Sequence, residues 1–147
     1  MPDQPPAHRP ARAMGAATVF MVALAGGAVW CLLSLYVRAR MPWFAFVIAL
    51  FVAWALRSHG VGGRAGAALG TLSVLLATVY AACLQAVAEI ASRVGMPMGE
   101  AFARMDPWLA LDVARWNADG WSIATALLAA LLAAILAWRG SRRADSP

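Results

Sequence analysis

The sequence predicts an all-α integral membrane protein with four transmembrane helices and one or two short interfacial helices between the third and the fourth. Of its 147 residues, 63% are hydrophobic and only 13% are charged, whereas soluble domains are about 45–50% apolar and about 25% charged. The apolar residues form four runs, and the segments between these runs carry the arginines, as expected for residues that flank membrane spans. The length suits one domain, predicted over residues 13–139.

The net charge of +5 does not indicate a nucleic-acid-binding protein. The twelve basic residues are all arginines and occur in ones and twos between apolar runs, whereas a nucleic-acid surface gathers them on one folded, soluble face. Cys31 and Cys83 lie inside apolar runs without metal-ligand spacing, and His8 and His59 have no second ligand nearby. We therefore expect no cofactor, no metal site and no nucleic-acid partner. The cysteines are small apolar filler or, since they lie at similar depths, neighbours.

The first apolar run follows a proline-rich stretch, residues 1–12, that is predicted to be a disordered tail. The run itself, residues 13–37, is too long for the hydrophobic region of a signal peptide, which has about 7–15 residues. It is predicted to remain attached as a membrane span. Gly26 and Gly27 near its middle allow close helix contact or a slight kink.

The second run, residues 41–56, is short. At about 1.5 Å per residue it reaches roughly 24 Å, against about 30 Å for the hydrocarbon core of a bilayer. Trp43 and Trp54 lie near its ends, where aromatic rings prefer the headgroup level, and Arg40 and Arg57 can extend to the same level. We expect a full span; the alternative is a re-entrant hairpin with the first helix.

The third run, residues 65–92, is the one around which the fold is predicted to be organised. It follows a glycine-rich loop that lacks the phosphate-binding pattern G-x-x-x-x-G-K-[ST]. Small residues recur at helical spacing and share one face, which lets a second helix approach closely in lipid. The residues expected to pack in this way are Gly62, Gly66, Gly70, Ala77 and Ala81.

Polar residues continue this face toward the end of the same helix. Glu89 stands out because a carboxylate in a membrane segment is a functional-site hypothesis by default, but the favoured interpretation is an interfacial ion pair with Arg93, four residues later. About 20 residues suffice to cross the bilayer, so Glu89 is expected at or just past the far interface. The alternatives are a proton- or ligand-handling role and an ion pair with a partner protein. Gln85 is expected to form an interhelical hydrogen bond.

Residues 95–119 are too charged to span the membrane and too apolar for a solvated loop. Pro97 and the Asp106–Pro107 pair are typical helix starts, so two short interfacial helices are predicted, at residues 97–105 and 107–116. This stretch either packs in the membrane interface or docks on a partner. Its candidate contact residues are Met98, Glu100, Phe102, Arg104, Asp106, Trp108 and Trp116.

The last run, residues 120–138, is rich in alanine and offers another small face for helix contact; residues 140–147 are predicted to be a cytoplasmic tail. With both ends in the cytoplasm, seven arginines fall on the inner segments and five on the outer ones. Since cytoplasmic loops carry the excess of arginine, both termini are expected in the cytoplasm, with the protein in a bacterial inner membrane.

The expected function is that of a non-catalytic accessory or assembly subunit of a membrane complex such as a permease. The chain would dock on another membrane protein, or on copies of itself, through the face that carries Gly62, Gly66 and Gly70. An enzyme needs a nucleophile with its base, a metal cluster or paired carboxylates in one pocket, and the acids here lie near arginines or helix starts. The alternative is a small oligomeric transporter or channel that uses Glu89 and Gln85.

Overall fold

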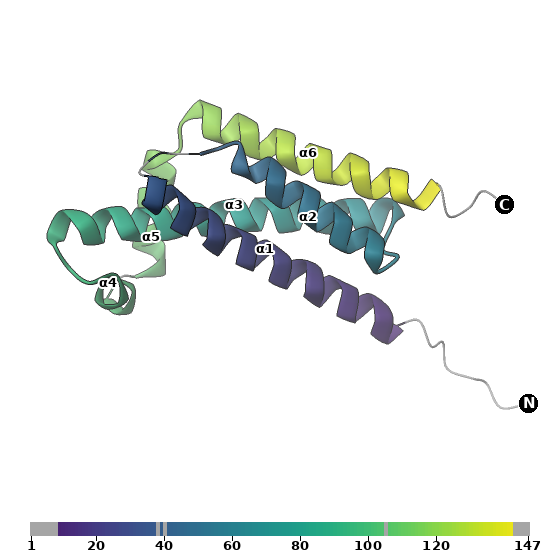
Figure 1. Cartoon of the computed structure of the whole chain (residues 1–147), viewed down its shortest axis with the longest axis horizontal. Coiled ribbons are helices and arrows are strands. Elements are labelled where there is room, and N and C mark those ends of the chain that lie inside the picture. The colour runs from purple at the N-terminus through teal and green to yellow at the C-terminus, as the bar shows by residue number, and fades with distance from the viewer. Residues whose placement is uncertain (1–8, 38, 40, 105, 143–147) are drawn as a thin grey trace, which may run out of the picture.

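The structure, a computed structural model, describes residues 9–37, 39, 41–104 and 106–142. All regular structure in these ranges is α-helical (Figure 1), which confirms the all-α prediction. The two predicted tails lie largely outside the described residues, and the first and last helices extend into them. The helices are α1 (Arg9–Val37), α2 (Phe44–Ser58), α3 (Gly63–Val94), α4 (Met98–Arg104), α5 (Pro107–Asn117) and α6 (Gly120–Arg142).

Four of these helices, α1, α2, α3 and α6, form an up-and-down bundle (Figure 1). Both ends of the described chain lie at one end of this bundle, and the short helices α4 and α5 lie at the other, which we call the polar end. The central helix is α3, because it contacts each of the other five. The packing of α3 therefore determines how the remaining helices are placed.

Three helices are long and apolar enough to cross a bilayer: Met14–Val37, Gly63–Val94 and Gly120–Arg139, with 24, 32 and 20 residues. About 20 apolar residues suffice for a crossing. These three helices indicate a multi-pass integral membrane protein. The fourth long apolar segment, α2, has 15 residues and a length of about 22 Å, which is less than a hydrocarbon core of about 30 Å.

The helix α2 begins three residues later than the sequence predicts, and the reason is Pro42. A residue that precedes proline is disfavoured in helical geometry, so Met41 and Pro42 form a turn instead. Their carbonyl oxygens accept hydrogen bonds from the amides of Phe44 and Ala45, at 3.1 and 3.2 Å. This turn shortens α2 and leaves its start at the polar end of the bundle.

Despite its length, α2 is deeply inserted between its neighbours, and it contacts α1, α3 and α6. Val52 and Leu56 are completely buried. At the opposite end of α2 from the turn, Arg57 Nη2 donates to the backbone oxygen of Leu136 in α6, at 3.1 Å. The guanidinium thus links α2 to α6 as well as marking the end of an apolar segment.

The small-residue face of α3 is occupied by other parts of the same chain. A Cβ atom added at Gly66 would lie 2.5 Å from the backbone oxygen of Val61 and 3.7 Å from Cβ of Ala137 in α6. A Cβ atom at Gly70 would likewise lie 3.7 Å from Cβ of Ala133. The part of the face that carries Gly66 and Gly70, which the sequence analysis assigns to a partner, is therefore covered by the same chain: by Val61, by Leu56 of α2 and by α6.

The same kind of close approach joins α3 to α1. A Cβ atom at Gly27 would lie 3.0 Å from the backbone oxygen of Ala77, so a larger residue there would push the two helices apart. Ala77 and Ala81 are both buried. Gly62, the first of the small residues, has an extended conformation and immediately precedes α3. Small residues thus bring α3 close to two neighbours at once.

Replacing Gly66 by alanine tests how tightly α3 is packed. In an open helical position alanine stabilises a helix by about 1 kcal/mol relative to glycine, but at Gly66 the added methyl group meets the backbone of Val61, which cannot rotate away as a side chain can. We expect Gly66→Ala to destabilise the protein by about 1–3 kcal/mol, measured by unfolding in mild detergent with increasing sodium dodecyl sulfate. Gly99→Ala, at a glycine surrounded by open space, should be neutral or stabilising; equal stability of the two variants would contradict the close contact.

Candidate functional site at the polar end

A groove of about 310 Å³ lies at the polar end of the bundle, beyond the glycine contacts between α3 and α6. Its walls come from α1, the turn before α2, α3, α5 and α6. We call it the end groove. Most of its wall is apolar, and the polar residues on it are Thr78, Gln85, Glu89, Arg115, Asn117 and Ser122.

Helical spacing and the docking of α5 bring these residues together. On α3, Thr78, Gln85 and Glu89 are separated by seven and four residues and so share one face. On α5, Ala110 packs with Val87 and Ala91 of α3 in a small apolar cluster. This contact holds α5 against the last turns of α3, and it carries the end of α5 to the edge of the groove.

Glu89 accepts hydrogen bonds from Arg93 and Asn117. Arg93 Nη2 donates to its Oε1 atom at 2.6 Å, and Asn117 Nδ2 of α5 donates to its Oε2 atom at 3.4 Å. The side chains of Glu89 and Arg93 are 37% and 75% exposed, and an ion pair as exposed as this contributes about 1 kcal/mol or less. The pair with Arg93 is the one that the sequence spacing indicates, while Asn117 adds a link between α3 and α5.

Gln85 and Trp30 line the same groove. Gln85 Nε2 donates to Ser34 Oγ of α1 at 3.3 Å, which is the interhelical role expected of it. The indole of Trp30 is 8% exposed and lies near Phe44, with ring centroids 6.3 Å apart. Its Nε1 atom is buried and has no hydrogen-bond partner within the described part of the chain. Leaving a buried donor unsatisfied costs about 1–3 kcal/mol.

Sequence reasoning does not bring Trp30, Arg115 or Asn117 to the groove. Trp30 lies within an apolar run, where nothing distinguishes it from an aromatic residue used only for packing. Arg115 and Asn117 lie more than twenty residues beyond Glu89 in the sequence, and only the docking of α5 brings them to the groove. The helix start predicted at Asp106 is the sole sequence signal that a short helix could return toward α3.

The predicted helix starts and charge pairs of α4 and α5 are present, outside the groove. Asp106 Oδ1 accepts from the amide of Trp108 at 3.0 Å, with proline at the first helical position, which is the cap that the sequence predicts. Arg104 Nη2 lies 2.7 Å from Glu100 Oε1, and both side chains are exposed. These groups stabilise short helices locally.

The outer side of α5 is exposed and aromatic. Trp108 and Trp116 are 74% and 90% exposed, which is unusual for side chains of this size. The side chains of Met98 and Phe102, which the sequence analysis groups with them, lie outside the described residues. The exposed tryptophans remain candidates for the membrane interface or for a partner surface.

Within the described ranges, no three side chains of His, Cys, Asp or Glu come together in a way that could hold a metal ion. Cys31 is buried, Cys83 is partly buried, and both are free thiols. The end groove is therefore defined by hydrogen-bonding and charged groups on an apolar wall.

Comparisons of the chain with protein-family models, with curated proteins and with solved structures give no match. The fold and the groove together define the class of protein. It is a small, all-helical, multi-pass membrane protein with an amphipathic groove at one end of its bundle. The arguments for function rest on the residues of this groove and on the surfaces around it.

Replacing Glu89 by alanine tests the link between α3 and α5. The change removes the acceptor for Arg93 and for Asn117, so we expect α5 to open more often. Amide hydrogen exchange over residues 107–117 should accelerate roughly two- to fivefold, which corresponds to about 0.5–1 kcal/mol for exposed charged hydrogen bonds; mass spectrometry measures it in detergent. Glu100→Ala breaks the other i, i+4 pair, which lies within α4 alone, and should leave α5 unchanged. Equal acceleration in both variants would rule out the link.

Proposed function

We propose that this chain is a non-catalytic accessory or assembly subunit of a membrane complex such as a permease. In this proposal it is a four-span protein of the bacterial inner membrane, with both termini in the cytoplasm. Its partner is another membrane protein or a second copy of the chain, and its contribution is to hold or complete that assembly.

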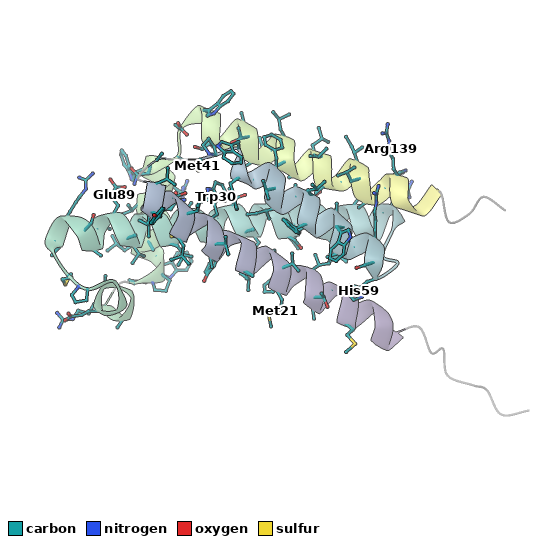
Figure 2. All side chains as sticks on the ribbon, in the orientation of Figure 1. Met21, Trp30, Met41, His59, Glu89 and Arg139 are labelled. Atoms are coloured by element: carbon teal, nitrogen blue, oxygen red, sulfur yellow. The ribbon has the colours of Figure 1, made fainter. Side chains whose placement is uncertain are left out.

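The observation that carries the proposal is the distribution of polar groups along the bundle. Charged side chains of the described residues lie toward the two ends, as Glu89 and Arg139 do in Figure 2. A path for a polar substrate needs polar groups near the middle of the membrane, and catalysis needs reactive groups that converge in one pocket. The observed distribution of polar groups favours neither a transport path nor an enzyme. The buried polar side chains of the described residues are the hydroxyl groups of Ser34, Ser73 and Thr125.

The four-span topology is supported by the arrangement of the chain ends. Both lie at one end of the bundle (Figure 1), which is consistent with an even number of crossings, and α2 supplies the fourth. A short helix is accommodated when the bilayer thins locally or when flanking residues reach toward the interface. The seven-to-five distribution of arginines favours the cytoplasmic side for the two chain ends.

The docking surface that we propose is the outer side of α5, because α6 already covers the glycine face of α3. Trp108, Leu109 and Trp116 are exposed there. Tryptophan is among the residues that most often dominate binding energy at protein interfaces. In the alternative, these rings lie among the lipid headgroups, where tryptophan is also enriched.

Co-purification tests this surface. We expect the tagged chain, extracted in mild detergent, to bring down one membrane partner in fixed ratio. Replacing both Trp108 and Trp116 by serine should reduce the recovered partner more than tenfold, because a dominant interface residue contributes about 2 kcal/mol or more. Trp54→Ser, which removes a ring of α2 that is 68% exposed, should leave recovery unchanged. Full recovery of the partner with the double variant would show that the partner binds another surface. The two tryptophans would then be assigned to the lipid interface.

A second candidate function, a small oligomeric transporter or channel, is favoured by one observation: Gln85 and Glu89 both line the end groove. A carboxylate that handles protons must change its charge during transport. In reconstituted vesicles, Glu89→Gln should then abolish proton-coupled uptake, with Glu100→Gln as the matched control. An accessory subunit carrying Glu89→Gln should still assemble with its partner, so retained complex and unchanged transport would exclude this second function.

A further inference from the structure

A second groove, of about 340 Å³, lies between α3 and α6 at the end of the bundle that carries the two chain ends. We call it the basic-end groove. Its wall is mostly apolar and consists of Ala67, Ala134, Ile135, Trp138 and Arg139. The small side chains of the two alanines leave a hollow beside the close contact of the two helices. The hollow has an apolar floor, and its one charged wall residue is Arg139.

A second arginine lies at the same depth as Arg139. The helices α3 and α6 run antiparallel (Figure 1), and a Cβ atom added at Gly66 of α3 would lie 3.7 Å from Cβ of Ala137. Arg64 precedes the first of these residues by two positions, and Arg139 follows the second by two, so the two arginines are level. Arg64 also precedes Ala67 by three positions, which places it on the face of α3 that forms the groove wall.

The charges of the described side chains are divided between the two ends of the bundle, as Glu89 and Arg139 show in Figure 2. The acidic residues of the described ranges all belong to the polar end; they are Glu89, Glu100, Asp106, Asp112 and Asp119. At the opposite end, Arg57 donates to the backbone of α6. Within the described part of the chain, Arg64 and Arg139 form no ion pair or side-chain hydrogen bond. This end therefore presents positive charge that nearby acids do not balance.

Unbalanced positive charge beside an apolar hollow complements an anionic phospholipid. The apolar span of α3 begins at Gly63 and that of α6 ends at Arg139, so the arginines lie at the level of the lipid headgroups. A guanidinium group matches the geometry of phosphate oxygens, and basic pockets between membrane helices bind anionic headgroups. A zwitterionic headgroup would bring an ammonium group, which the arginines repel.

An apolar track leads from the groove toward the middle of the bundle. Ile135, Leu131 and Leu127 precede Arg139 at four-residue steps, so they share one face of α6, and all three are exposed. From Arg139 to Leu127 the track is about 18 Å long at about 1.5 Å per residue. Half of a hydrocarbon core of about 30 Å is about 15 Å. A tail of a lipid in this leaflet can therefore follow the track while it stays in the bilayer.

From these observations we infer that the basic-end groove binds one phospholipid whose headgroup carries a net negative charge. The phosphate lies between Arg64 and Arg139. One tail covers Ala67 and Ala134 and continues along Ile135. The lipid fills the hollow beside the contact of α3 and α6 and connects the two helices at this end. The site lies at the opposite end of the bundle from the tryptophans of α5, so the inference does not depend on the partner surface proposed above.

Two adjacent alanines of α3 provide a matched test. Ala67 belongs to the groove wall, whereas Ala68 is exposed and does not. Ala67→Phe places a ring in the groove, and Ala68→Phe adds the same ring outside it. The full chain is purified in mild detergent, stripped of lipid, and mixed in turn with phosphatidylglycerol and phosphatidylcholine of identical tails. Native mass spectrometry then measures how much of the protein carries one lipid.

We expect phosphatidylglycerol to bind about tenfold or more tightly than phosphatidylcholine, because two arginines contribute about fivefold each. Arg139→Gln should lower the affinity for phosphatidylglycerol about fivefold. Arg104→Gln, which changes the net charge equally at the polar end, should leave this affinity unchanged. Ala67→Phe should abolish the preference for phosphatidylglycerol, and Ala68→Phe should preserve it.

Circular dichroism of each variant checks that it is folded. Arg139→Gln alters an exposed side chain, so it tests the inference even if Ala67→Phe does not fold. Equal affinity for the two lipids, equal losses in the two arginine variants, or equal binding in two folded alanine variants would overturn the inference. Displacement of the lipid by inorganic phosphate at the same concentration would also overturn it, because the site would then bind a free anion.

Discussion

The fold depends on how closely the backbone of α3 approaches its neighbours. In a bilayer, lipid tails are as apolar as the side chains of a helix, so burying leucine between two helices supplies little driving force. What remains is short-range dispersion, and each contact is worth only about 0.1–0.2 kcal/mol, so many are needed at close range. Gly66 and Gly70 against Ala133 and Ala137, and Gly27 against Ala77, allow this approach.

The polar end follows from the length of the same helix. With 32 residues, α3 is about 48 Å long, which is much longer than the thickness of a hydrocarbon core, about 30 Å. Its last turns can therefore carry Glu89 and Arg93 near water. They also offer Val87 and Ala91 as a platform on which α5 docks. The first half of α3 thus provides close packing through its glycines, and its second half provides a wall of the end groove.

Much of this arrangement is predictable from the sequence, because hydrophobic runs, caps and small-residue spacing are local signals. The six helices, the cap at Asp106 and the pairing of Glu89 with Arg93 all come from spacing along one segment. The identity of the helix that covers the glycine face cannot be predicted in this way, because it is not a local signal. A stripe such as Gly66 and Gly70 shows that some helix comes close, but it does not distinguish a helix of the same chain from one of a partner.

The site illustrates the same limit. Gln85 and Glu89 stand out in the sequence because polar residues are rare in apolar runs. Trp30, Arg115 and Asn117 join them only through contacts between distant segments. The start of α2 shows how one residue can move a boundary, since Pro42 delays it by three positions. Composition could not predict the unsatisfied indole nitrogen, because it depends on which atoms surround Trp30 in the folded bundle.

The contacts of α6 have a consequence for biosynthesis. Gly66 and Gly70 of α3 approach Ala137 and Ala133 of this helix, and Arg57 at the end of α2 donates to its Leu136. The ribosome adds these partners between 63 positions (Gly70 to Ala133) and 79 positions (Arg57 to Leu136) later. During that interval the faces of α2 and α3 that α6 later covers have no partner in the nascent chain and are accessible to the small-residue faces of other helices. Closure of the bundle therefore waits for the synthesis of α6, and a chain interrupted before α6 exposes the surface that the finished molecule conceals.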